Sequence, residues 1–274
     1  MPAQSFQIAK RPSSERGHAD HGWLNTYHTF SFADYYDPKY QEFGALRVLN
    51  EDRVKARRGF GTHPHRQYEI FSYIISGELE HKDSMGNIEV LQRGDVQFTT
   101  AGTGISHSEK NEHPSKPVHF LQIWTKPENS YLEPGYVTRR FQEADKRNRL
   151  QPFVSPYQDV VNALTTAETP TVLPDTIGIH TDLYAYSSIL EPGQTVVHQV
   201  VKSQTPGSAT RARRVYLHVI DKAGSLDVAD GQSETTTRLD KGDGAFITEV
   251  KPSGTIELAN PSDKPVEFIL FDLA

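Results

Sequence analysis

The chain of 274 residues contains no cysteine. Disulfide bridges, thiolate metal sites and cysteine nucleophiles are therefore all excluded. Any metal ion that the chain binds must be held by histidine and carboxylate side chains. The 12 histidines make such a site possible.

Positive charge and long apolar runs are also scarce. The 29 lysines and arginines are outnumbered by 35 acidic residues, and the net charge of −6 argues against the basic surface of a nucleic-acid-binding protein. No stretch approaches the roughly 18 apolar residues of a membrane span, and the N-terminal sequence lacks the basic-then-apolar order of a signal peptide. We therefore expect no direct nucleic-acid partner, no membrane partner, and a cytoplasmic protein that is also nuclear if its source is eukaryotic.

What the sequence does contain is a succession of short apolar runs rich in β-branched and aromatic residues. Turn-forming residues bound these runs, as in Ser76-Gly77 and Arg93-Gly94-Asp95. The pattern predicts an all-β fold of antiparallel strands arranged as a barrel or sandwich. The strands expected in the first half cover residues 46–49, 69–75, 88–91, 96–99 and 119–124. Helical periodicity is confined to residues 138–146 and 156–163, which we expect to form a short helical connector.

Three short motifs recur at nearly one offset. At offsets of 147, 148 and 148 residues, Gly77-Glu78-Leu79 returns as Gly224-Ser225-Leu226, Arg93-Gly94-Asp95 as Lys241-Gly242-Asp243, and Lys116-Pro117-Val118 as Lys264-Pro265-Val266. Repetition at a fixed spacing indicates tandem duplication. We therefore predict two copies of one β domain, the first at residues 1–140 and the second at residues 141–274. Within the second copy, residues 203–214 are expected to form an exposed loop.

Two pairs of potential metal ligands stand out against this β pattern. His63-Pro64-His65 places two imidazoles two residues apart, and His107-Ser108-Glu109 repeats the spacing with an imidazole and a carboxylate. Side chains two apart on a strand share a face, so neighbouring strands could bring three nitrogens and one anionic oxygen to one ion. Such a donor set suits divalent iron, nickel, copper, manganese or zinc. Fewer than six protein ligands would leave positions open for water, dioxygen or a chelating substrate.

The spacing of these residues resembles the two sequence motifs of the cupin superfamily. The matching positions are His63, His65, Glu69 and Gly77 in the first motif, and Gly94, Gly104 and His107 in the second. In that arrangement Glu69 would supply the carboxylate ligand. The residues alone therefore leave Glu69 and Glu109 as alternatives.

Longer blocks resemble the pirin family, and several are particularly similar to its bacterial quercetinase-type branch. These blocks are residues 22–24, 28–32, 35–38, 46–50, 63–66, 80–87 and 100–109 in the first half, and residues 197–199, 214–216 and 270–273 in the second. The resemblance covers nearly the whole chain and is most specific in the first half.

The resemblance implies a bicupin, with two tandem antiparallel β-barrel or jelly-roll domains and one metal ion in the N-terminal barrel. It implies that this ion is bound by the matching residues, which are His63, His65, His107 and Glu109. Fe(II) is the expected ion, with Ni, Cu, Mn and Zn as alternatives. The pirin pattern thus favours Glu109 over Glu69 as the ligand and leaves Glu69 a structural neighbour.

The resemblance also implies quercetin 2,3-dioxygenase activity, in which a flavonol binds the metal, dioxygen attacks, and the heterocycle opens with loss of carbon monoxide. Glu109, as a carboxylate at the metal, could receive the proton of the flavonol hydroxyl. Phe60, Phe71, Phe98 and Trp124 are candidates for an apolar wall. The alternative is an iron-dependent, redox-sensing regulatory protein that binds a transcription factor without turnover, and the same four ligands would serve it.

The second copy lacks this ligand set. Adding the repeat offset to the four ligand positions leads to Thr210, Ala212, Thr255 and Glu257. We therefore predict a C-terminal domain without a metal site, and a monomeric chain. Of the nine remaining histidines, five are expected to pack in the core (His28, His81, His119, His198 and His218) and three to lie in surface loops (His18, His21 and His113).

Overall fold

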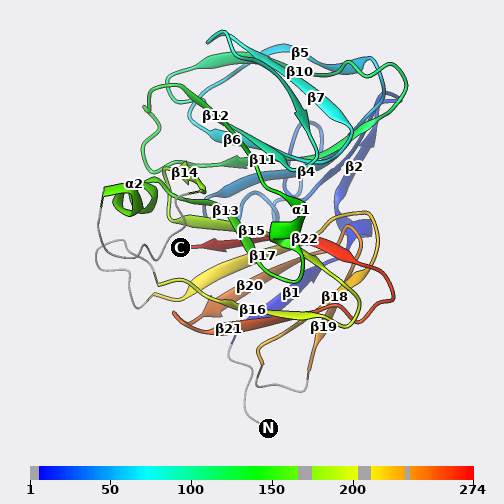
Figure 1. Cartoon of the computed structure of the whole chain (residues 1–274), viewed down its shortest axis with the longest axis vertical. Coiled ribbons are helices and arrows are strands. Elements are labelled where there is room, and N and C mark those ends of the chain that lie inside the picture. Colours follow the sequence, from blue (N-terminus) through cyan, green and yellow to red (C-terminus); the bar gives the residue numbers. More distant parts are fainter. Residues whose placement is uncertain (1–5, 166–174, 203–210, 232–234) are drawn as a thin grey trace. The chain divides into compact units, whose positions relative to one another are not determined.

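The computed structural model describes residues 6–165, 175–202, 211–231 and 235–274, and consists almost entirely of β-strands (Figure 1). The chain divides into two compact units. One is continuous and covers Arg16–Phe141, whereas the other combines the N-terminal segment up to Glu15 with Gln142–Ala274. The predicted all-β fold is confirmed. Among the residues described, no helix is long and apolar enough to cross a membrane.

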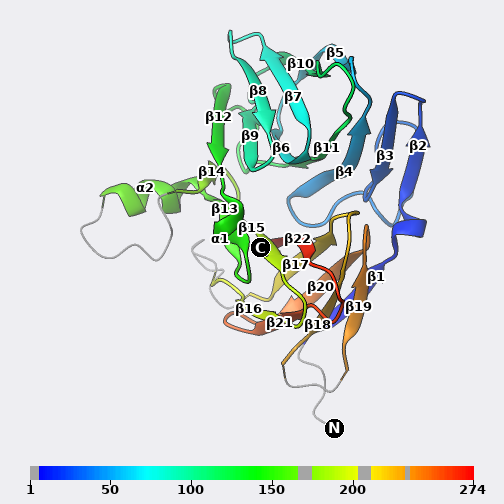
Figure 2. The same ribbon diagram turned by 45° about the vertical axis from the view of Figure 1, so that its right-hand side comes forward.

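The continuous unit contains two antiparallel sheets. Its strands are β2 Gly17–Asp20, β3 Leu24–His28, β4 Leu46–Val54, β5 Arg58–His65, β6 Glu69–Ser76, β7 Glu78–Asp83, β8 Ile88–Gln92, β9 Asp95–Thr100, β10 Ile105–Asn111, β11 Val118–Thr125 and β12 Gly135–Arg140. The larger sheet has seven strands in the order β12-β9-β6-β11-β4-β3-β2, and the smaller has four in the order β5-β10-β7-β8. Figure 2 shows the β2–β3 hairpin, in dark blue, beside β4 at the end of the larger sheet.

The discontinuous unit repeats this plan. Its strands are β1 Gln7–Arg11, β13 Gln151–Pro156, β14 Ile177–Ile179, β15 Leu183–Leu190, β16 Thr195–Gln199, β17 Arg213–Val219, β18 Ser225–Ala229, β19 Thr237–Asp240, β20 Gly244–Val250, β21 Thr255–Ala259 and β22 Val266–Leu273. The sheets run β1-β20-β17-β22-β15-β13-β14 and β16-β21-β18-β19. Its helices are the 3-10 turn Ser13–Glu15, α1 Glu143–Lys146 and α2 Tyr157–Thr165.

The repeated motifs occupy matching positions in the two units. Gly77 and Gly224 both have positive φ, at 81° and 78°. A Cβ added at either glycine would lie 2.4 Å from the carbonyl oxygen of Pro117 or 2.8 Å from that of Pro265, respectively. Each glycine therefore permits both the left-handed turn and the close approach of the partner repeat motif.

A buried asparagine completes the same arrangement in each unit. Asn111 Nδ2 donates to the carbonyl oxygens of Val54 and Lys116, at 3.0 and 2.8 Å. Its counterpart Asn260 donates from Nδ2 to the carbonyl oxygens of Leu190 and Lys264, both at 2.8 Å. The same pair of hydrogen bonds therefore occurs in both units, as the internal repeat in the sequence predicts.

Two stretches of the fold differ from expectation. Residues 138–140 were expected to be helical but belong to β12, so α1 has only four residues. Arg213 was expected in an exposed loop, yet it lies in β17 and is 1% exposed. Its guanidinium bonds the carboxylates of Asp272 and Asp182, which explains how a charged side chain is accommodated in the interior. Of the rest of that loop, residues 203–210 lie outside the described residues, Arg211 and Ala212 are exposed as expected, and Arg214 belongs to β17.

The N-terminal segment up to Glu15 was expected in the first domain, but it belongs to the discontinuous unit. β1 pairs with β20 in antiparallel register from Gln7 to Arg11, within a sheet of the discontinuous unit. Lys10 Nζ lies 2.8 Å from Asp243 Oδ2, which strengthens this attachment. The spacing of internal repeats cannot reveal such a pairing, because β1 precedes the first repeated motif.

Candidate metal centre

Three of the four proposed ligands converge in the continuous unit. The ring centroids of His63, His65 and His107 are 4.7, 4.6 and 4.6 Å apart pairwise. One ring nitrogen from each lies within 4.8 Å of those of the other two. Among the residues that the structure describes, no other three histidine or acidic side chains converge in this way. We call these three residues the histidine triad.

Strand pairing brings the triad together. His63 and His65 lie two residues apart on β5, and His107 stands directly opposite His63 on the neighbouring strand β10. The register then shifts, because Glu109 on β10 pairs with Phe60 rather than with a residue two positions from His63. Irregularities of this kind are common beside functional sites, since they redirect side chains. Here the shift lies next to the triad, between His63 and Phe60.

A hydrogen bond to the backbone prepares the His63 ring for a cation. His63 Nδ1 donates to the carbonyl oxygen of Gly61 at 2.7 Å, which leaves Nε2 as the free acceptor. The Nε2 atoms of His63 and His107 are 3.1 Å apart. Two nitrogens bound at about 2.1 Å to one ion, at a right angle, would be separated by about 3.0 Å. The observed spacing therefore fits a shared metal ion.

Two histidines of the triad, His65 and His107, are kept neutral by their surroundings. Burial, together with the His107 and His63 rings, lowers the pKa of His65 to about 4, against the opposing effect of the Glu109 carboxylate. Burial and the His63 and His81 rings lower the pKa of His107 to about 3, although Asp83 opposes this. Neutral imidazole is the form that binds metal ions. The donor chemistry thus fits a divalent transition metal.

Glu109 lies close to this group without joining the cluster of ring nitrogens. The side chain is 1% exposed, and it accepts hydrogen bonds from Ser72 Oγ at 2.9 Å and Gln122 Nε2 at 2.7 Å. Its charge acts on the pKa of His65, which places the carboxylate within electrostatic reach of the triad. The 4.8 Å cluster nevertheless contains only the three histidines, so the assignment of Glu109 as fourth ligand stays a proposal.

Glu69, the alternative carboxylate, occupies a different setting. It is fully buried on β6, where its Oε1 accepts a hydrogen bond of 3.2 Å from Thr100 Oγ1. Thr100 stands opposite Glu69 on β9, so this bond joins two strands of the larger sheet. Glu69 too lies outside the histidine cluster.

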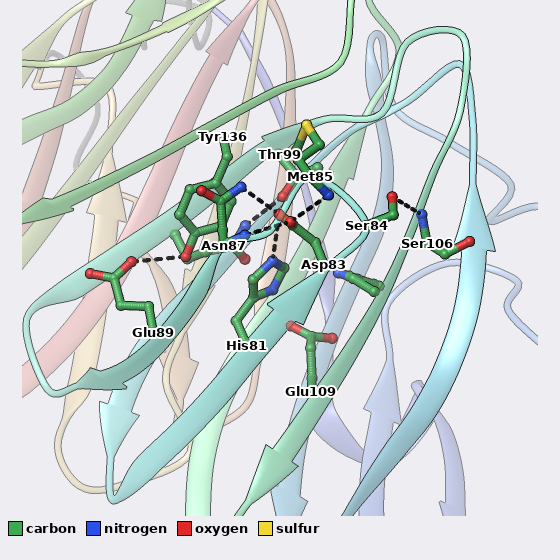
Figure 3. Close-up of polar contacts among 12 residues, drawn as sticks. His81, Asp83, Ser84, Met85, Asn87, Glu89, Thr99, Ser106, Glu109 and Tyr136 are labelled. Carbon is green, nitrogen blue, oxygen red and sulfur yellow. Dashed lines mark hydrogen bonds and ion pairs between the residues drawn. The ribbon is translucent and has the colours of Figure 1, made fainter.

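A histidine–aspartate pair that the sequence did not single out adjoins the triad (Figure 3). His81 Nε2 lies 3.2 Å from Asp83 Oδ2, and the His81 ring centroid lies 5.2 Å from that of His107. Burial raises the pKa of Asp83, but bonds from Asn87, His81 and the Met85 amide outweigh it and lower the pKa below its usual value. Asp83 therefore anchors both the turn after β7 and the His81 ring.

Aromatic side chains border one side of the triad. The Trp124 ring stands edge-on to His65 at 4.8 Å, and it contacts Tyr68 and Phe32, both at 5.5 Å. Of the other candidates for an apolar wall, Phe71 and Phe98 stack on each other in the core. Phe60 lines a separate cavity.

The triad can be reached from solvent through a depression that borders His65. It has a volume of about 570 Å³ and is lined by Pro64, His65, Arg66, Ser84, Gly104, Ile105 and Ser106. His63 and His65 are both partly exposed, whereas His107 is buried. A small molecule therefore has access to the site.

The corresponding positions of the second unit hold no such group among the described residues. Ala212 is exposed, Thr255 and Glu257 lie on β21, and Thr210 falls outside the described residues. His198 is buried and bonds Asp272 Oδ2 at 2.9 Å, in agreement with a structural role.

Comparisons with known proteins cover nearly the whole chain. The Pirin family model matches residues 9–125. Quercetin 2,3-dioxygenase of Escherichia coli strain K12 is 36% identical over 266 residues, which are 97% of this chain and 98% of that protein. A pirin-like protein of Caulobacter vibrioides is 32% identical over 97% of this chain and 100% of its own length.

A solved structure of a bacterial pirin is also similar to this chain over nearly its whole length. The crystal structure of the bacterial pirin YhhW from Escherichia coli in complex with nickel(II) matches with a TM-score of 0.77 and 35% identity. The match covers 97% of this chain and 99% of that one. The metal-bound relative therefore resembles this chain over both units.

Proposed function

The chain belongs to the pirin family, and from this premise we propose that it is a metal-dependent dioxygenase that opens a flavonol and releases carbon monoxide. The observation that carries the proposal is the histidine triad, in which one ring nitrogen from each residue lies within 4.8 Å of the other two and the Nε2 atoms of His63 and His107 are 3.1 Å apart. The similarity to quercetin 2,3-dioxygenase of Escherichia coli supports flavonol and dioxygen as the substrates.

We assign the binding of one divalent ion to His63, His65, His107 and Glu109. Fe(II) is the ion we expect, and the nickel(II) complex of a bacterial pirin supports nickel as an alternative. When bound, the ion would acidify the flavonol hydroxyl and bring the flavonol and dioxygen together. The His63 bond to Gly61 keeps Nε2 oriented for this purpose.

Glu109 is the residue that we assign to proton transfer. An ionised carboxylate can take the proton of the flavonol hydroxyl, and Ser72 and Gln122 hold its two oxygens in place. Trp124, which stands edge-on to His65, is placed to border the aromatic substrate and keep water from that side. In this proposal Ser72 and Gln122 orient the Glu109 carboxylate, and Trp124 excludes water beside it.

The direct test is turnover of a flavonol by protein of measured metal content. We expect the loaded protein to bleach the flavonol absorption aerobically, with dioxygen consumed and carbon monoxide released, and to leave it unchanged anaerobically. Turnover should fall in step with metal occupancy across His63→Ala, His65→Ala and His107→Ala. Fully loaded protein that bleaches several flavonols no faster than the free metal would refute the activity.

A second measurement then addresses the regulatory alternative. If the protein binds metal but does not turn over flavonols, the affinity for a protein partner should be compared between the reduced and oxidised metal. Glu109→Asp adds a test of mechanism, because it keeps the charge but withdraws the carboxylate by one methylene group. A rate loss larger than the loss of metal would support the role of Glu109 in positioning or proton transfer.

A further inference from the structure

Two of the proposed ligands on β10 have a second pair of polar side chains beside them on β7. In the register of these strands, His107 is directly opposite Asp83 and Glu109 is directly opposite His81. Residues that stand opposite each other on neighbouring antiparallel strands present their side chains to the same face of the sheet. The side chains of His81 and Asp83 are both fully buried, so they can act on the ligands without contacting solvent.

The turn after β7 fixes the Asp83 carboxylate, and the carboxylate in turn orients the His81 ring (Figure 3). Asp83 Oδ1 accepts hydrogen bonds from the backbone amides of Met85 and Asn87, at 2.9 and 3.0 Å. Its Oδ2 accepts from Asn87 Nδ2 at 2.8 Å and lies 3.2 Å from His81 Nε2. An imidazole that donates from Nε2 to a carboxylate can accept a hydrogen bond at Nδ1 in the same tautomer.

The nitrogens of His107 have complementary requirements. Its Nε2 lies 3.1 Å from His63 Nε2, on the side where the ion is proposed to bind. A histidine that binds an ion through Nε2 carries its proton on Nδ1, and this proton is almost always donated to a neighbouring acceptor. Among the described residues, His107 Nδ1 has no hydrogen-bond partner, and neither has His81 Nδ1.

These two nitrogens belong to neighbouring buried rings. The ring centroids of His81 and His107 are 5.2 Å apart and the planes meet at 72°, which allows a nitrogen of each ring to come within hydrogen-bond range of the other. Buried polar atoms are nearly always bonded in folded proteins. A donor and an acceptor that both lack partners, on adjacent rings, therefore satisfy each other.

The other polar side chains around His81 are engaged elsewhere. Glu89 on β8 stands opposite it, and the Tyr136 ring packs against it at 4.9 Å. The Tyr136 hydroxyl donates to Glu89 Oε2 at 2.8 Å, and Glu109 accepts hydrogen bonds at both of its oxygens. The unpartnered donor beside His81 is thus His107 Nδ1.

We propose that His81 is a positioning residue of the metal centre, which accepts a hydrogen bond at Nδ1 from the Nδ1–H of His107 while Asp83 holds its tautomer. Such a bond fixes the plane of the His107 ring and makes its Nε2 a stronger donor to the ion. The inference rests on the metal site assigned in the proposed function, and it does not depend on flavonol turnover.

The first test is the affinity for Ni(II), measured by competition with a chromophoric chelator. His81→Phe keeps a buried aromatic ring but has no acceptor, and it should weaken binding by about 10- to 100-fold. His81→Gln offers a carbonyl oxygen to His107 and an amide to Asp83, so it should stay within a few-fold of the parent. His119→Phe is the matched control, because His119 is a buried histidine bonded to a carboxylate, Glu51 Oε1, at 2.8 Å on the larger sheet.

The second test needs no substitution in the pair. Nitrogen-15 NMR of the Zn(II)-loaded parent reports which ring nitrogens carry protons. We expect a proton on His107 Nδ1 in slow exchange with water, and His81 protonated on Nε2 with Nδ1 bare. Asp83→Asn keeps an oxygen for the turn amides but lets its amide donate to His81 Nε2, which should move the His81 proton to Nδ1 and weaken Ni(II) binding.

The outcomes separate this inference from the proposed function. Parent affinity in His81→Phe, or an equal loss in His81→Gln or His119→Phe, would overturn it, because packing alone would explain the result. A proton on His81 Nδ1 in the loaded parent would overturn it even if His81→Phe does not fold. A parent that binds no Ni(II) would refute the metal site and this inference together. The expected protonation without flavonol turnover would refute the dioxygenase activity alone.

Discussion

Gln122 Nε2 donates a hydrogen bond of 2.7 Å to Glu109 Oε2 across the interior of the continuous unit. The bond joins β11 of the larger sheet to β10 of the smaller one, and Ser72 on β6 bonds the other carboxylate oxygen. The carboxylate beside the triad is therefore oriented from the opposite sheet. The histidines of the triad all lie on strands of the smaller sheet, so residues of both sheets determine the geometry around the triad.

The two candidate carboxylates can be separated by matched substitutions. Glu109→Gln should weaken metal binding by at least about 100-fold, because an amide replaces a carboxylate donor beside three imidazoles. In the parent protein the Glu69 carboxylate accepts a hydrogen bond from Thr100 Oγ1. Glu69→Gln should therefore keep a metal affinity within a few-fold of the parent value. Competition against a chromophoric chelator measures both values, and the reverse result would favour the cupin arrangement with Glu69 as ligand.

Metal stoichiometry is a second prediction. We expect one transition-metal ion per chain by elemental analysis, and loss of that ion in His63→Ala and in His107→Ala. His198→Ala is the control in the other unit, where the ring bonds Asp272, and it should retain the metal. Two ions per chain, with one retained when the triad is removed, would contradict the prediction.

The raised pKa of Asp52 predicts a pH dependence of stability. Its value of about 7, against the usual 3.8, means that the folded state keeps a proton that the unfolded state has lost between these pH values. Stability is therefore lost as pH rises through this window, by roughly 4 kcal/mol at most. Asp52→Asn should gain stability relative to the parent by a similar amount between pH 4 and pH 8.

Urea unfolding of the metal-free parent and the Asp52→Asn variant, at both pH values, measures this change. The comparison between the two proteins cancels the titration of all other groups that the substitution does not disturb. A difference in the free energy of unfolding that stays constant with pH would show that Asp52 titrates normally.

Gly59 and Gly61 provide a paired test of the packing around the site. A Cβ added at Gly59 would lie 2.3 Å from the backbone oxygen of Glu109 and 2.5 Å from the Cα of Lys110, whereas one added at Gly61 meets nothing within 4 Å. Gly59→Ala should therefore push β5 from β10, lower stability by about 1–3 kcal/mol and weaken metal binding. Gly61→Ala should change neither the stability nor the metal affinity. Thermal unfolding measures the stability of the two variants, and metal titration measures their affinity.

Much of the fold and the triad could be predicted because both depend on short-range patterns. Short apolar runs bounded by turn residues located β4, β6, β8, β9 and β11. Residues two apart on a strand share a face. That rule placed His63 beside His65. The resemblance to a known family then connected this pair with His107, which the strand register brings opposite His63.

The features that escaped prediction depend on contacts between distant segments. Arg213 sits in a run of basic residues that suggests a solvent-exposed loop, and only its ion pairs with Asp182 and Asp272 explain its burial. The pairing of Thr26 with Asp52 likewise depends on strand register. The His81–Asp83 pair is an exception, because the two residues lie two apart on β7 and the same-face rule could have joined them.

The attachment of β1 to β20 has a consequence for the order in which the chain is completed. The first strand to leave the ribosome finds its partner only when residues 244–248 have been made, whereas Arg16–Phe141 is one uninterrupted stretch. The unit with the triad can thus be complete while the other still lacks most of its strands. Translation therefore completes the unit with the histidine triad first, and β1, although made earlier, is added at the edge of its sheet only near the end of synthesis.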